Sequence, residues 1–514
     1  MVSLGLALWC VALALVAIPT TVSAQGPVYL PLDDPVSGYV DALVARGAFP
    51  RLSALERPYL ATTVRSAADS ALRAQDGRLL APESWYREVL RVAERYAGEA
   101  APSHDLRASA WLTPYLTAQT TGRRELMLAD GPSGGLPGAD LRAALGTSVF
   151  AAVARLRIDR GLRTDPEFIG KKDRSLTARM EEAYLSARWR FAELSFGRVA
   201  RNWGPAPLDG LQVGHYADSY DHLNLRLGVD ALHLSTIVAR LDDMTIGTDS
   251  VAQRYFTAHR LAARWRRVEI AASEAIVYGG IARGFEPSLA NPLTILDLLQ
   301  YNERQSLNVN YGLDVAWRTA TRGMYSGQLL LDDFQIDRCG TRCKEPASIG
   351  YTLLAEGMPL AGNARSFASY TRVTNLTYRS ANPWERYTSF DLSLGRGQSD
   401  YDEARAGIEL APTLGGPLRL YGAYRRQGEG DYRRPFPPVA DNPTTPLIFA
   451  GVVIRVTRAA VQWTRSGRIS LTADVGYNWV TNAGHVSGRR DDGVEGRIRL
   501  SIAPAIALST VLND

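Results

Sequence analysis

Aromatic, acidic and histidine side chains gather in one short run, HYADSYDH, at residues 215–222. Such a run suits carbohydrate binding, because aromatic faces stack on the C–H faces of a sugar ring while carboxylates accept hydrogen bonds from its hydroxyl groups. Two histidines beside two aspartates could also hold a metal ion. The third interpretation is an ordinary polar loop. The run supplies four candidates for polysaccharide contact: His215, Tyr216, Asp218 and Tyr220.

A second distinctive run is RNWGP, at residues 201–205. Trp203 could stack on a sugar ring while Arg201 and Asn202 bond its hydroxyl or carboxylate groups. The alternative is a turn at a strand end, with Trp203 at a membrane interface. Arg226, on a later alternating segment, completes the set of candidate polysaccharide contacts.

The sequence carries little that points to catalysis. HExxH, P-loop and EF-hand patterns are absent, and we predict neither enzyme activity nor a cofactor or metal. One alternative is a hydrolase built on His222, its neighbour Asp221 and Ser219.

Lysine occurs only at 171, 172 and 344, so nearly all of the 58 basic residues are arginine. They are spread along the chain without a compact basic patch, so no nucleic-acid partner is expected.

Alternating segments dominate the chain from about residue 105 onward and must position these residues. SLNVNYGLDVAWR (306–318) and HLNLRLGV (222–229) each place apolar residues on one face and polar residues on the other. Roughly 16–18 such segments follow one another, many about ten residues long. Aromatic residues close the apolar face near segment ends, as in an interfacial girdle. We therefore predict an all-β outer-membrane barrel with lipid outside and a hydrated lumen; the alternative is a soluble periplasmic β-sandwich.

The N-terminal hundred residues differ from the rest. Residues 1–24 have the form of a signal peptide, so export to the outer membrane is expected. Residues 25–100 read as a helical region, with helices expected near 35–47, over 57–75 behind a capping box SALE (53–56), and over 83–98. The barrel is expected over 101–514. Its segment 280–302 breaks the alternation and is predicted to fold over or into the barrel, and Cys339 and Cys343 are predicted to form a loop disulfide.

The order and spacing of several motifs resemble the Wzi family of capsule-assembly outer-membrane proteins. They are YLPLDDPVSGYVDALVARGAF (29–49), GRVARNWGPAPLDGLQV (197–213), EPSLANPL (286–293) and LLLDDF (329–334). The resemblance implies an 18-stranded barrel with a helical bundle at its periplasmic end. It also implies a non-enzymatic role in binding capsular polysaccharide or exopolysaccharide at the cell surface. We expect a monomer in contact with outer-membrane lipid; a porin for small solutes or sugars is the rival function.

Overall fold

The computed structural model describes residues 26–74, 80–101, 105–128, 133–174, 177–296, 298–299, 307–333, 346–412 and 415–512. The predicted signal peptide and the cysteine pair at 339 and 343 lie outside these residues.

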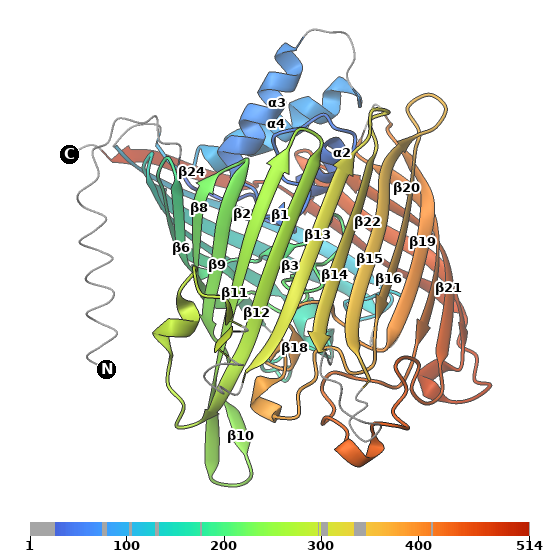
Figure 1. Cartoon of the computed structure of the whole chain (residues 1–514). Coiled ribbons are helices and arrows are strands. Elements are labelled where there is room, and N and C mark those ends of the chain that lie inside the picture. Colours follow the sequence, from blue (N-terminus) through green and yellow to red (C-terminus); the bar gives the residue numbers. More distant parts are fainter. Residues whose placement is uncertain are drawn as a thin grey trace.

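One antiparallel sheet closes on itself as an 18-stranded barrel, which confirms the predicted fold class (Figure 1). Its strands are β2 (Leu106–Gln119), β3 (Gly134–Gly146), β4 (Phe150–Asp159), β5 (Ala178–Arg188), β6 (Ala192–Arg198), β8 (Asp221–Val229), β9 (Leu232–Arg240), β11 (Ser250–Trp265), β12 (Val268–Ile281), β13 (Asn308–Arg318), β14 (Met324–Asp333), β15 (Ser348–Pro359), β16 (Arg365–Val373), β19 (Tyr401–Leu410), β20 (Leu418–Gln427), β21 (Ile454–Arg465), β22 (Ile469–Thr481), β23 (Gly493–Ile502) and β24 (Ile506–Leu512). A small strand β10 (Met244–Ile246) extends β11 beyond the rim.

The seam of the barrel is made by a strand in two pieces. β23 pairs with the second half of β2, from Tyr115 to Gln119, and β24 pairs with its first half, from Leu106 to Leu112. Counted as one broken strand, β23 and β24 complete the 18. The C-terminal segment therefore closes the barrel against its first strand.

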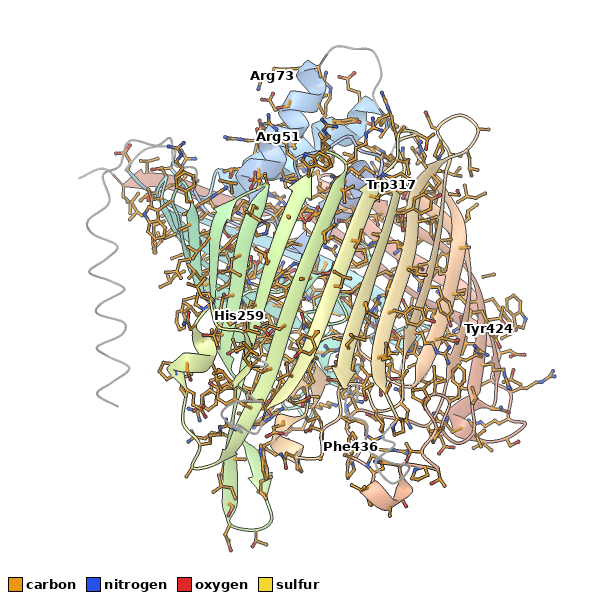
Figure 2. The ribbon with its side chains drawn as sticks, viewed as in Figure 1. Arg51, Arg73, His259, Trp317, Tyr424 and Phe436 are labelled. Carbon is orange, nitrogen blue, oxygen red and sulfur yellow. The ribbon has the colours of Figure 1, made fainter. Side chains whose placement is uncertain are left out.

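The alternation seen in the sequence separates the two faces of the wall. On β13, Leu313 and Trp317 are 45% and 50% exposed, whereas Asn310 and Asp314 on the other parity are fully buried inside. Aromatic side chains lie on the outer face toward both ends of the strands, with Trp317 near one end and Tyr424 toward the other (Figure 2). An apolar outer belt between aromatic girdles is the arrangement of a membrane barrel.

Three helices cover one end of the barrel: α2 (Val36–Ala45), α3 (Ala61–Arg73) and α4 (Glu83–Ala97) (Figure 1). Short turns such as 147–149 and 266–267 join the strands at this end, and longer loops join them at the other. Outer-membrane barrels carry short turns on the periplasmic side, so the helices lie at the periplasmic end. Within the described ranges, no helix has both the length and the apolar character needed to cross a bilayer.

The predicted capping box at residues 53–56 is wrong. α3 begins at Ala61 and has no side-chain cap. The Ser53 hydroxyl instead bonds Glu269 on β12, and the Glu56 carboxylate meets His233 of β9 at 2.7 Å. These contacts hold the segment against the inner wall. Because both side chains bond the wall, neither caps a helix.

The lumen is filled from both ends. β1 (Glu56–Arg57) enters from the periplasmic side and pairs with β7 (Asn202–Trp203), which belongs to the long β6–β8 loop from the opposite rim. The β16–β19 loop, with its two short strands β17 (Thr388–Ser389) and β18 (Leu392–Ser393), folds inward beside them. We call residues 49–60, 199–220 and 374–400 together the plug. The apolar side chains of the plug are Trp203, Leu211, Tyr378, Tyr387 and Leu394, and they form one buried cluster with inner-wall residues such as Phe256 and Val277.

Candidate functional site

A cavity of about 750 Å³ lies between the plug and the barrel wall. Its lining comes from the N-terminal segment at Asp33, from the β2–β3 loop at Glu125, from the β6–β8 loop, and from the inner faces of strands including β5 and β22. Its size is within the range of about 300–1,000 Å³ that is usual for ligand pockets. The cavity therefore has room for a small oligosaccharide.

The lining is densely charged. Among the described residues, nine arginines and nine carboxylates border the cavity, so its net charge depends on which of them are paired. Arg124 is the most connected: it donates to Asp165 at 2.9 Å and to Asp218 at 3.0 Å, and also bonds the carbonyl of Tyr216. Since these partners belong to two other extracellular loops, Arg124 joins three loops at the cavity.

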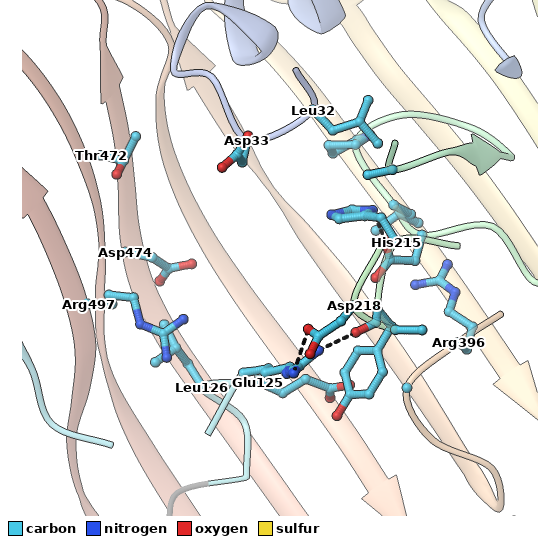
Figure 3. A pocket seen from close by; sticks show the side chains of 18 of the residues that line it. Leu32, Asp33, Glu125, Leu126, His215, Asp218, Arg396, Thr472, Asp474 and Arg497 are labelled. Carbon is cyan, nitrogen blue, oxygen red and sulfur yellow. Dashed lines mark hydrogen bonds and ion pairs between the residues drawn. The ribbon is translucent and has the colours of Figure 1, made fainter. Parts of the chain in front are cut away.

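Two arginines differ from the rest. In the part of the chain that the structure describes, neither Arg396 nor Arg497 has a carboxylate within 4 Å. Arg396, on the plug, donates to the Thr352 hydroxyl at 3.3 Å, and its Nε atom is buried without a partner. Arg497, on β23, donates to the Gln119 side chain at 3.3 Å and to a backbone carbonyl. The two guanidinium groups lie on opposite sides of the cavity (Figure 3), so an anion between them would meet positive charge from both.

Of the predicted binding residues, His215, Tyr216 and Asp218 line this cavity. The Tyr216 hydroxyl donates to Glu167, and its ring lies 5.6 Å from the Arg124 guanidinium, with 8% of the residue exposed. Asp218 is held by Arg124 and Arg179. His215, whose side chain is 41% exposed, is therefore the most accessible of the three.

The remaining predicted contacts do not face the cavity. Trp203 is 1% exposed in the core of the plug, and the Asn202 amide donates to the Leu208 carbonyl at 3.0 Å. Arg201 donates to His222 at 2.8 Å, and the Tyr220 ring packs against that histidine. Arg226 borders a smaller cavity toward the periplasmic end. The geometry of these five residues fits structural roles: four build the plug and its junction with β8, and Arg226 contacts Asp230 at 3.4 Å.

The geometry disfavours a hydrolase built on His222. Its Nε2 atom accepts from Arg201, and its Nδ1 atom lies 3.0 Å from the Tyr220 carbonyl, so both ring nitrogens are engaged. The Ser219 hydroxyl donates to the Glu181 carbonyl at 2.7 Å instead of meeting the imidazole. A general base must reach the proton that it removes, and this histidine does not. Across the described residues, no group of three or more His, Cys, Asp and Glu side chains could hold a metal ion.

Two groups at the cavity form an ion pair within one loop. His215 Nδ1 contacts a carboxylate oxygen of Asp209. Burial alone would raise the pKa of the Asp209 carboxyl, but the charge of His215 and their hydrogen bond lower it to about 2. Burial would lower the pKa of His215, but Asp209 outweighs it and raises this pKa above its ordinary value of 6.5.

This pair predicts that the β6–β8 loop loosens at alkaline pH. Because the pKa of His215 is raised on folding, its contribution is complete below about pH 6.5 and declines as the pH rises through the raised pKa. The contribution of Asp209 is present above its ordinary pKa of 3.8 and is lost only as the pH falls toward 2. We expect hydrogen exchange over residues 205–220, corrected for intrinsic rates, to be faster at pH 8.5 than at pH 5.5. His215→Gln should abolish the difference; a difference that survives this substitution would have another origin.

Comparisons with known proteins reach this chain through structure alone: no family model and no curated protein sequence matches it. A solved structure of Wzi from Escherichia coli, an outer-membrane protein involved in group 1 capsule assembly and described as a carbohydrate-binding β-barrel, superposes with a TM-score of 0.61. It covers 93% of this chain and 100% of that one at 13% identity. Pseudomonas aeruginosa OpdK with vanillate superposes with a TM-score of 0.44 at 12% identity, over 79% of this chain and 100% of that one. The chain has the fold of an outer-membrane barrel, distantly related in structure to Wzi.

Proposed function

We propose that this protein binds an anionic capsular polysaccharide or exopolysaccharide and helps to hold it at the cell surface. The observation that carries the proposal is the cavity beside the plug, where Arg396 and Arg497 lie on opposite sides and neither has a described carboxylate within 4 Å. Uronate and other acidic sugars present carboxylates, which guanidinium groups bind through paired, charge-assisted hydrogen bonds. The fold-level likeness to a carbohydrate-binding barrel supports the same class of ligand.

The plugged lumen favours a binding role over passage of solutes. Segments from both rims meet inside the barrel at the β1–β7 pair, with Gly204 donating to the Leu55 carbonyl at 2.8 Å. Trp203 and Asn202 lie in this region, so the RNWGP run helps to close the lumen. A binding site that is closed behind its ligand retains a polymer, whereas a porin must release its solute on both sides.

Deletion of the gene tests the proposal. We expect the total amount of surface polymer to be unchanged and a larger share of it to appear in the medium, with the wild-type gene restoring the cell-bound fraction. The measurement is the partition of polysaccharide between washed cells and supernatant. An unchanged partition would refute attachment, and the single-channel conductance of the purified barrel would then be measured as the test of a porin.

A further inference from the structure

The loop between β12 and β13 lies against the outer face of the barrel wall. We call its described part, residues 282–296 with 298 and 299, the outer-wall loop. Leu289 and Leu296 of this loop are fully buried in a cluster with Ile276 and Tyr278 of β12. Those two strand residues share the parity of Ile270, which is 46% exposed on the lipid side. Figure 1 shows the loop outside the ring of strands, beside β9 and β11, so the expectation that this segment folds over or into the barrel is wrong.

The outer-wall loop reaches well below the rim. The Leu296 amide donates to the Glu274 carboxylate at 2.9 Å, and Glu274 is paired in register with His259 on β11. His259 lies six residues from Trp265 at the periplasmic turn. At about 3.3 Å per residue and a tilt of roughly 40°, this height is about 15 Å above that end, within an apolar band of about 25 Å. The tip of the loop therefore lies at the depth of the bilayer.

Backbone at this depth needs its polar groups satisfied, because lipid offers no hydrogen bonds. The loop meets much of this need from its own residues and from the wall. The Glu286 amide donates to the Tyr278 hydroxyl at 3.3 Å, and the amides of Leu289 and Thr294 donate to carbonyls within the loop. The two prolines, at 287 and 292, have no N–H to satisfy.

Large apolar side chains are exposed on the face of the loop that points away from the wall. Leu293 is 81% exposed, Ile295 57% and Leu298 50%. The neighbouring wall presents further exposed apolar side chains on its lipid-facing parity, Ile270 at 46% and Leu313 at 45%, so the loop extends the apolar belt of the wall. Beneath the loop, the outward-facing Glu274 and His259 are polar groups that this belt would otherwise expose to lipid.

We propose that the outer-wall loop is a membrane-contacting element whose partner is the acyl-chain region of the outer leaflet. The loop covers β11–β13 where lipid would otherwise lie, and it shields Glu274 and His259 from the acyl chains. Its own Leu293 and Ile295 contact the acyl chains instead. The inference concerns the outside of the barrel and is independent of any ligand in the lumen.

Spin labels on the full-length protein in lipid nanodiscs test this. Single cysteines replace Leu293 or Ile295 in a background in which Cys339 and Cys343 are serine. Two matched controls carry the label at Leu313, on the lipid-facing wall, and at Thr248, on the exposed β10–β11 hairpin. Power saturation then measures access by molecular oxygen, which concentrates in lipid, and by a water-soluble nickel chelate.

The expected result is high oxygen and low nickel access at positions 293 and 295, as at 313. Nickel access like that at 248 would place the loop in water and overturn the proposal. Low access to both reagents, with dipolar broadening between labels, would mean that a second copy covers the loop and would overturn it equally. Glu274→Ala removes the acceptor for Leu296, so it should raise nickel access at 293; unchanged access would refute the wall anchor.

Discussion

Asp314→Ala is expected to lower the free energy of unfolding by about 3–5 kcal/mol, the usual loss when one partner of a buried ion pair is removed. Asp314 on β13 is fully buried and receives an ion pair from Arg260 on β11, which is 1% exposed. Arg260 also donates to the Leu55 carbonyl at 3.3 Å and lies 5.5 Å from the ring centre of Trp203. Without Asp314, an unpaired guanidinium remains where the wall meets the plug. The midpoint of urea unfolding, followed by heat-modifiable gel mobility, measures the loss.

The matched control is Asp69→Ala on α3, which breaks an exposed i,i+4 ion pair with Arg73. The stabilisation by such an exposed helix pair rarely exceeds about 0.5 kcal/mol. Replacing both Arg260 and Asp314 by leucine should recover much of the loss, because an apolar pair leaves no uncompensated charge. If Asp314→Ala unfolds at the wild-type midpoint, the buried pair does not stabilise the junction of wall and plug.

Arg396→Met is expected to weaken binding of an anionic polysaccharide by roughly ten- to a hundredfold, since a hydrogen bond to a charged group contributes about 1.5–3 kcal/mol. The side chain faces the cavity without a carboxylate partner among the described residues, so its charge is free for a ligand. Arg497→Met should act in the same direction from the opposite side. Titration of purified protein with acidic and neutral polymers measures the effect.

Arg87→Met serves as the control, because it removes the same charge from the exposed face of α4 at the far end of the molecule. It should leave affinity for both polymers unchanged. If Arg396→Met reduces binding of neutral and acidic polymers equally, the arginine shapes the cavity without recognising charge. If neither arginine matters, the site of polymer contact lies elsewhere, such as in the extracellular loops.

The barrel wall was predictable because its rule is local. Each strand residue faces either lipid or lumen, and the medium on each side selects the residue type, so Leu313 and Asp314 reveal their faces by parity alone. The helices at 36–45 and 83–97 could be predicted equally well, from the spacing of their apolar residues and from the prolines that precede them. The seam could not be predicted, because nothing in the local sequence of β23 and β24 shows that both strands pair with β2.

The plug escaped prediction because its contacts join segments far apart in the chain. Ser53 and Glu56 have the spacing of a helix cap, but their partners are on β12 and β9, about 180 to 215 positions away. The residues around Trp203 suggest a ring that stacks on a sugar or an anchor at the membrane interface, but Trp203 packs in an apolar cluster within the lumen. No local pattern distinguishes an aromatic ring that stacks on a ligand from one that is buried in an apolar cluster.

The cavity was found in part. The run at 215–222 does reach it through His215, Tyr216 and Asp218. Arg396 was missed, although it stands between two glycines in a stretch without alternation, which marks a backbone free to fold inward. Arg497 looked like any other polar residue on a strand. It differs from the paired arginines of the wall because, among the described residues, no carboxylate lies within 4 Å of it, although Asp474 is its cross-strand partner.

The positions of the plug segments and of the closing strands limit how the barrel can close. Residues 56 and 57 of the plug are made before any wall strand, and the ring is completed only when residues 493–512 reach β2. A lumen already occupied from both rims leaves little passage for threading a segment through a finished ring. The barrel must therefore close around its contents, and one side of β2 stays unpaired until β23 and β24 reach it.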